Sequence, residues 1–116
     1  MKRLTANTIG ILQGDETLFE DFEDGGEMWT GTGQRERRKP VRFSEGFTDA
    51  PVVHCSLSLW DVDNGANMRA HVEAENVGAE GFDLVFRTWG DTRIARVRLD
   101  WIAIGSVANE DDWELY

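Results

Sequence analysis

The sequence is poor in cysteine, proline and basic residues. It has one cysteine and two prolines among 116 residues, and its 12 lysines and arginines face 22 aspartates and glutamates, so that the formal net charge is −10. A single cysteine excludes a disulfide within the chain. The acidic excess argues against nucleic acid or an anionic membrane surface as the main partner, because both are bound through positive charge.

Long apolar runs are also missing. No segment approaches the roughly 20 apolar residues of a membrane-spanning helix, so we expect no membrane insertion. Lys2 and Arg3 are typical of the start of a signal peptide, but Thr5, Asn7 and Thr8 interrupt the apolar stretch that should follow. We therefore expect a protein that is cytoplasmic, particle-borne or exported without a cleavable signal peptide.

Catalytic motifs are equally scarce. His54 and Cys55 are adjacent, and neighbours on a strand point to opposite faces, so they make a poor catalytic dyad. His71 stands among charged residues and is interpreted as a solvated or salt-bridged histidine. The sequence contains no nucleophile elbow, no phosphate-binding glycine motif and no Cys/His metal spacing. We expect no enzymatic activity, no catalytic residues and no cofactor.

Two acidic segments raise the question of a metal. Residues 15–27 contain seven carboxylates and no basic residue, and we interpret them as a loop that packs its aromatic side chains against the fold, with a metal site as the alternative. The segment Asp61–Gly65 starts like a calcium-binding loop but lacks the third oxygen ligand and the distal glutamate of that motif. We interpret it as an Asx-type turn, with calcium as the alternative.

Apolar residues that alternate with polar ones dominate the chain, and this pattern predicts strands rather than helices. The predicted strands are residues 7–14, a basic edge strand that leads into Val41 and Phe43, residues 52–60, residues 68–76, a strand that buries Phe82, Leu84 and Phe86, and residues 92–105. Five or six short antiparallel strands in a domain of this size predict a small β-sandwich. Cys55 falls on an inward-facing position and is expected to be a buried thiol.

The outward faces of the later strands also carry apolar side chains. These are Trp60, Val85, Ile94, Ile102 and Ile104. Opposite charges on neighbouring strands are expected to pair with one another, but the apolar residues call for a second packing surface. A cyclic homo-oligomer is the simplest way to supply one.

Trp89 is the most suggestive single residue. It stands beside the polar loop of Gly90, Asp91 and Thr92, and strand alternation places it away from the predicted core. Arg69 lies on an outward face one strand away, with a guanidinium suited to bind adjacent hydroxyl groups. An aromatic platform next to a few convergent polar groups is typical of a small-ligand site, and its chemistry suits a sugar. Core packing and an oligomer interface are the alternative roles for Trp89.

Several short motifs resemble the H-type lectins, a family that includes snail agglutinin and the C-terminal domains of discoidins. The resemblance runs from about Phe43 to Ile104, and Asn67-x-Arg69 and Trp101-Ile102-Ala103 are its specific parts. The further matching motifs are Pro51-Val52-Val53, Ser56, Asp61-Val62, Gly81-Phe82, Thr88-Trp89, Thr92 and Leu99-Asp100. Residues 1–42 match only loosely.

The resemblance implies a six-stranded antiparallel β-sandwich that assembles as a homotrimer, or as a hexamer of two trimers. It implies glycan partners, with galactose or N-acetylgalactosamine bound between protomers. Arg69 would come from one protomer, and Trp89 with the loop residues Gly90 and Asp91 from its neighbour. The glycine-containing loop before the second strand, Thr32 and Gly33 here, would complete the site. No metal ligand is implied.

Two departures from the family pattern bear on the sugar preference. Gly90 stands where animal members carry a histidine, and Ala95 replaces a tyrosine that lines the family site. The sequence therefore predicts a carbohydrate-binding, non-enzymatic lectin that attaches to clustered glycans or cell surfaces. The alternative is a structural or receptor-binding trimeric module, for example of a phage-like particle, with a lost or altered sugar site.

The chain is predicted to form one domain in three parts. Residues 1–42 supply an N-terminal strand and the acidic and glycine-rich loops, 43–105 form the lectin-like core, and 106–116 form an acidic C-terminal tail. The lack of disulfides fits a reducing compartment.

Overall fold

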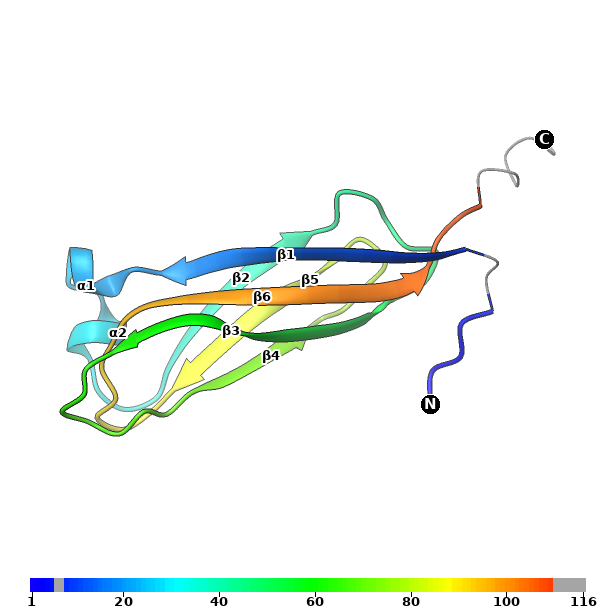
Figure 1. Ribbon diagram of the computed structural model, residues 1–116. Helices are drawn as coiled ribbons and strands as arrows, with labels where there is room; N and C mark the ends of the chain where they lie inside the picture. The colour runs from blue at the N-terminus through cyan, green and yellow to red at the C-terminus, as the bar shows by residue number, and fades with distance from the viewer. Residues whose placement is uncertain (6–7, 110–116) are drawn as a thin grey trace.

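Two three-stranded antiparallel sheets pack face to face in the computed structural model, which describes residues 1–5 and 8–109 (Figure 1). The first sheet has the order β1 (Ile9–Phe19), β6 (Ile94–Ser106), β3 (Val52–Val62), and the second has the order β2 (Arg35–Arg42), β5 (Gly81–Thr88), β4 (His71–Glu75). The predicted β-sandwich is confirmed, with the basic strand β2 at a sheet edge. Most of the predicted tail, residues 110–116, lies outside the described residues.

The core lies between the sheets and follows the alternation of the sequence. On β5, Phe82, Leu84 and Phe86 are buried, and they belong to one cluster with Val97 and Leu99 of β6. Burying an apolar side chain of this size stabilises a fold by about 1.5–3 kcal/mol relative to exposure. The two sheets are therefore held together by the inward faces that the sequence predicts.

The predicted loop over 15–27 is wrong in its first part. Strand β1 continues to Phe19, whose ring is buried in the core. Two short helices follow, α1 (Asp21–Asp24) and α2 (Glu27–Thr30). The buried Asp21 carboxylate accepts a hydrogen bond from the backbone N–H of Met28 at 2.8 Å and pairs with Arg37 of β2 at 2.8 Å. The acidic segment is thus a folded cap on one end of the sandwich (Figure 1).

Two residues expected on outward faces are fully buried. Val85 is on the outer face of β5, but its cross-strand neighbours are Arg38 and Glu73, and long charged side chains cover apolar surface with their stems. Ile94 belongs to the core because the pairing of β3 with β6 shifts register between Asp61 and Val62, which interrupts the alternation at the start of β6. Neither side chain needs a second protomer to cover it.

The pair His54–Cys55 and the turn after β3 agree with the expectations from the sequence. His54 is exposed and Cys55 is buried, and this burial raises the pKa of the Cys55 thiol. In the turn, the Asp63 carboxylate accepts a hydrogen bond from the backbone N–H of Gly65 at 2.8 Å, which confirms the Asx-type turn. Within the described part of the chain, no group of three histidine, cysteine or acidic side chains is arranged to hold a metal, and no helix there is long enough to cross a membrane.

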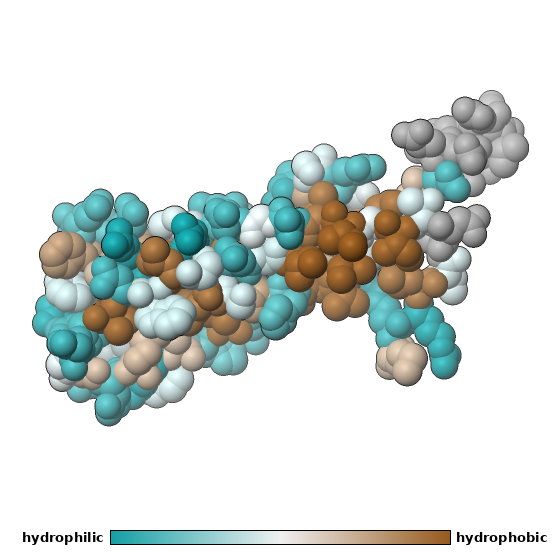
Figure 2. Space-filling view, viewed as in Figure 1, coloured by the Kyte–Doolittle hydropathy of each residue, from teal (hydrophilic) through white to brown (hydrophobic). Residues whose placement is uncertain are grey.

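An apolar patch remains uncovered on the outer face of the first sheet. Figure 2 shows it as a brown area over β1, β6 and β3, near the chain ends. Cross-strand pairing places Ile11, Ile104 and Val52 in one row across the three strands. The patch consists of Ile9, Ile11, Val52, Ile102 and Ile104, of which the first three are exposed and the last two half-buried.

Candidate functional site

The candidate site lies at the end of the sandwich where β2 begins and β5 ends. His71 of β4 pairs with Arg87 of β5. Next to this last ladder pair, the Thr88 hydroxyl donates to the backbone carbonyl of Arg69 at 2.6 Å, which keeps the two segments together beyond the ladder. Because alternate residues share a face, Arg69 and Trp89 lie on the outer side of the second sheet. This agrees with the outward position that the sequence predicts for both residues.

Arg69 contacts the loop that follows Trp89. Its Nη1 donates to the Asp91 carboxylate at 2.5 Å and to the Thr92 hydroxyl at 3.2 Å. The hydrogen bond from Arg69 lowers the pKa of Asp91, so this carboxylate is ionised at neutral pH. The Thr92 hydroxyl is itself bonded to the backbone carbonyl of Asn67. The guanidinium and the carboxylate therefore form one fixed polar pair at the surface.

Gly90 is required by both its backbone and its neighbour. Its φ of +68° lies in the left-handed region, where residues with a Cβ are strained. A Cβ at this position would also lie 3.0 Å from Nη1 of Arg69. Glycine therefore lets the Arg69 guanidinium lie against the loop, where a larger residue would displace it.

The loop before β2 meets the loop after β5 through backbone contacts. The N–H of Gly33 donates to the carbonyl of Gly90 at 2.9 Å, and Gly33 has a φ of +78°. Thr32 is exposed beside it. These contacts bring Thr32 and Gly33, predicted from the resemblance, close to Gly90 and its neighbours.

Arg35 holds the two loops together through hydrogen bonds to their backbone. It is only 6% exposed, and in all of its described side-chain hydrogen bonds the guanidinium donates to a backbone carbonyl. Nη2 donates to Gly90 at 3.2 Å and Nε to Gly33 at 3.1 Å, while Nη1 donates to Glu27 at 3.3 Å and Met28 at 3.2 Å. One buried side chain thus joins helix α2, the loop before β2 and the loop after β5. The sequence pattern placed Arg35 only on the basic edge strand and gave no sign of this role.

Trp89 is 43% exposed, and a cleft of about 650 Å³ opens beside it on the outer face of the second sheet. The cleft is lined by Gln34, Arg35, Glu36, His71, Arg87, Thr88 and Trp89. Arg69 and Asp91 are outside this lining. The cleft was not predicted from the sequence because Gln34 and Glu36, at the start of β2, are far from His71 and Trp89 in the chain.

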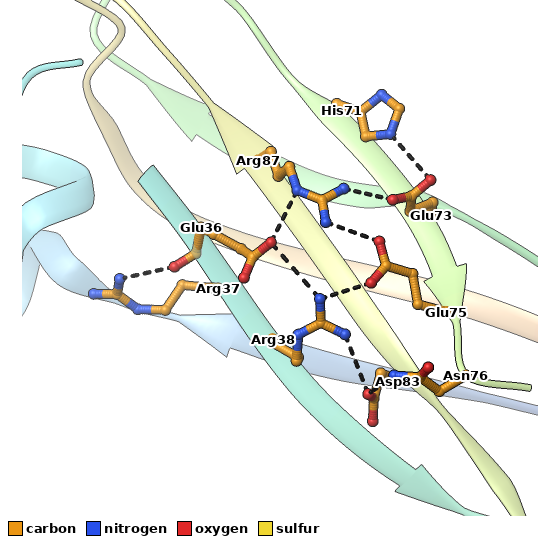
Figure 3. Close-up of polar contacts among 9 residues, drawn as sticks. All are labelled: Glu36, Arg37, Arg38, His71, Glu73, Glu75, Asn76, Asp83 and Arg87. Carbon is orange, nitrogen blue, oxygen red and sulfur yellow. Dashed lines mark hydrogen bonds and ion pairs between the residues drawn. The ribbon is translucent and has the colours of Figure 1, made fainter. Parts of the chain in front are cut away.

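Arg87 is at the centre of an ionic network on this face (Figure 3). Its Nε donates to Glu36 at 2.9 Å, its Nη1 to Glu73 at 2.5 Å and its Nη2 to Glu75 at 2.8 Å. Arg38 extends the network, since it also binds Glu75, at 2.7 Å. The pairing of opposite charges across strands, expected from the sequence, is confirmed here.

The network shifts the pKa values of its members. Hydrogen bonding with Glu73, then with Arg87 and Arg38, lowers the pKa of Glu75 to about 2. Hydrogen bonds to Glu75 and Glu73 raise the pKa of Arg87. His71 is at the edge of the network, with Nε2 3.4 Å from the Glu73 carboxylate. His71 is therefore an exposed histidine beside a carboxylate, as expected from its charged neighbours in the sequence.

Ala95 does not take part in this site within one chain. It is buried and lines a separate surface hollow with Phe22 of α1 and with Asp61 and Arg96. The structure thus brings Arg69, Gly90 and Asp91 together within one chain, whereas the resemblance implies that Arg69 and this loop come from different protomers. Ala95 lies elsewhere.

Comparisons with known proteins find a matching family model and several similar proteins. Residues 38–104 match the family model of the H-type lectin domain. The chain is 56% identical over 115 residues to "ATP synthase subunits region ORF 7" of Fuscovulum blasticum, with 99% of both chains covered. It is 35% identical over 77 residues to discoidin-2 of Dictyostelium discoideum, covering 65% of this chain and 30% of the discoidin. The solved structure of wild-type discoidin II of the same organism has the same fold, with a TM-score of 0.75, 24% identity, and coverage of 90% of this chain and 40% of that chain. The chain thus spans less than half the length of these discoidins.

Proposed function

The chain belongs to the H-type lectin domain family, and we propose on this premise that it is a non-enzymatic lectin that binds glycans carrying galactose- or N-acetylgalactosamine-type sugars. The proposed role is multivalent attachment to glycans or cell surfaces. The proposed sugar site consists of Arg69, Trp89, Gly90, Asp91, Thr32 and Gly33.

The observation that carries the proposal is the exposed ring of Trp89 beside the Arg69–Asp91 pair. A pyranose has an apolar C–H face and an edge of hydroxyl groups. An exposed indole offers an apolar surface to the first, while a guanidinium and an ionised carboxylate offer strong donors and acceptors to the second. Asp91 and Arg69 already hold each other in place, so little side-chain freedom is lost when a ligand binds.

The electrostatics of Asp91 favour binding over glycoside cleavage. A glycosidase uses two carboxyl groups, one of them an acid whose pKa is raised so that it can protonate the leaving group. The pKa of Asp91 is instead lowered by its hydrogen bond from Arg69. Such a carboxylate accepts hydrogen bonds from hydroxyl groups but is a poor proton donor at neutral pH.

The two outer faces of the sandwich differ in a way that supports a contact between protomers. The outer face of the second sheet has its charges paired within one chain and Val85 already covered. The outer face of the first sheet leaves Ile9, Ile11 and Val52 exposed. We propose that this apolar patch contacts a different surface of the neighbouring protomer, as the heterologous contacts of a trimer, or of a hexamer of two trimers, require, and that the sugar sites lie between protomers. Several weak sites on one particle would gain avidity on clustered glycans.

A glycan array with a matched tryptophan control tests this function. Wild-type protein should enrich glycans ending in galactose or N-acetylgalactosamine, and Trp89→Ala should abolish that binding. Trp60→Ala is the control because Trp60 is also an exposed tryptophan, 56% exposed, but on β3 of the other sheet. Binding lost equally in both variants, or no glycan enriched by a folded wild type, would contradict the proposal. The second result would favour a structural or receptor-binding module.

A further inference from the structure

The cleft beside Trp89 is large enough to hold a small ligand. Its volume of about 650 Å³ falls within the range of roughly 300–1,000 Å³ that is usual for small-molecule sites. The Arg69–Asp91 pair does not line this cleft, whereas Trp89, on the loop that carries Asp91, does. Apart from Trp89, no residue of the site proposed above lines the cleft.

The cleft's lining offers hydrogen-bonding groups of both kinds. The exposed side chains of Gln34, Glu36 and His71 lie around Trp89, at the mouth of the cleft. Gln34 has an amide that both donates and accepts, Glu36 accepts, and the His71 ring has a donor and an acceptor when neutral. These groups match the alternating donors and acceptors of sugar hydroxyl groups.

The charges around the cleft favour a neutral ligand over an anionic one. Two arginines line it. Arg35 is buried, and each of its guanidinium nitrogens is bonded to a backbone carbonyl. Each of the three guanidinium nitrogens of Arg87 is bonded to a carboxylate, from Glu36, Glu73 and Glu75. An incoming anion would have to displace one of these carboxylates and would remain close to the other two. A neutral polyhydroxyl ligand can donate to the remaining carboxylate lone pairs without breaking the pairs.

The same network makes the cleft rigid. It joins β2, β5 and β4 through Glu36, Arg87 and Glu73 (Figure 3). A site whose side chains are already held in place loses less conformational entropy on binding.

We propose that this cleft is a second sugar subsite, so that the ligand class is a neutral oligosaccharide of at least two rings. One ring binds at Arg69 and Asp91, the next binds among Gln34, Glu36 and His71, and Trp89 contacts both. The inference rests on the proposed lectin function and assigns a larger ligand to it.

Calorimetric titration with sugars of one and two rings tests the subsite. The probes are N-acetylgalactosamine and a panel of neutral disaccharides that place N-acetylgalactosamine at the non-reducing end with a 3-linked or 4-linked second ring. We expect at least one disaccharide to bind wild-type protein about tenfold more tightly than the monosaccharide. Glu36→Ala and His71→Ala should remove this gain while the monosaccharide affinity stays unchanged.

The control is Asp83→Asn, because Asp83 binds Arg38 in the same network but does not line the cleft. This variant should keep the gain, and thermal melting of all variants checks that each is folded. A monosaccharide that binds without any gain for the second ring overturns the subsite and leaves the lectin function standing. A loss of affinity for one and two rings alike in Glu36→Ala and His71→Ala also overturns the subsite. Failure of every sugar to bind the wild type overturns both proposals.

Discussion

Nη2 of Arg35 donates a hydrogen bond to the backbone carbonyl of Gly90, 3.2 Å away, although the two residues are 55 positions apart in the chain. The same guanidinium binds carbonyls of the loop before β2 and of helix α2. The loop that carries the candidate site is therefore held in place by a buried side chain from a distant strand.

Replacing Arg35 should weaken both the fold and sugar binding. Arg35→Met would remove the donor from several backbone carbonyls, and a buried acceptor without its partner costs about 1–3 kcal/mol. We expect the free energy of unfolding to fall by about 2–4 kcal/mol in urea denaturation, and sugar affinity to fall by tenfold or more. Arg35→Lys should rescue little, because an ammonium cannot reach the separate carbonyls that a guanidinium spans.

Arg42→Met is the control for Arg35, since Arg42 is on the same strand but exposed. It should leave both quantities unchanged. Wild-type sugar affinity in folded Arg35→Met would show that the residue does not position the site.

Substitution of Gly90 by alanine separates backbone strain from displacement of Arg69. Gly90→Ala should cost about 1 kcal/mol or more because of its positive φ, and its Cβ should push the guanidinium away. Gly25→Ala is the matched control: Gly25 has a φ of +70°, with nothing within 4 Å of a Cβ. We expect a similar stability loss in both variants and weaker sugar binding only in Gly90→Ala, measured by urea denaturation and calorimetry. Equal sugar affinity in the two would contradict the proposed place of Arg69.

The ionic network predicts a loss of stability in acid. The folded-state pKa of Glu75 is about 2, below its ordinary value of 4.5. A carboxylate with a lowered pKa contributes stability that is complete above the unfolded pKa and is lost as pH falls toward the folded one. The Glu75 contribution to the free energy of unfolding should therefore be constant above about pH 4.5 and decline between pH 4.5 and 2.

Glu75→Gln tests this assignment, because it should flatten part of the acid decline in urea denaturation curves recorded at each pH. Glu20→Gln, outside the network, should leave the decline as in wild type. An identical pH profile for Glu75→Gln and wild type would show that the network does not stabilise the fold.

A charge placed in the apolar patch should break the proposed oligomer. Ile11→Lys puts an ammonium in the row with Ile104 and Val52, where a contact between protomers would have to bury it at high cost. Thr17→Lys is the control on the same strand and face, outside the patch. In light scattering after gel filtration, we expect a trimer or hexamer for wild type and Thr17→Lys and a monomer for Ile11→Lys. An assembly that survives Ile11→Lys would place the interface elsewhere.

Strand alternation was enough to predict the sandwich, because the inward positions of β5 and β6 carry the buried apolar residues. It failed at Ile94, where the pairing with β3 leaves Ala95 as an extra residue in β6 and so changes the alternation. It also failed at Phe19, since the acidic residues around it favour a loop while core packing favours a strand. Such effects depend on partners distant in the chain.

The site was predictable to a similar extent. Arg69 and Trp89 were predicted from strand alternation and from the resemblance, and Gly90 and Asp91 from the resemblance. In the structure, Arg69 lies against Gly90 and Asp91. Arg35 could not be found in this way, because its partners are carbonyl groups, which every residue has. The cleft needs the side-by-side arrangement of β2, β5 and β4, which a local pattern does not give.

Soaking a crystal of the protein with N-acetylgalactosamine shows directly whether the sugar binds at Trp89. We expect a sugar ring against the indole of Trp89, with hydroxyl groups within hydrogen-bonding distance of Arg69 or Asp91. A sugar bound away from Trp89 in every copy, or no bound sugar at a saturating concentration with the site open to solvent, would contradict it.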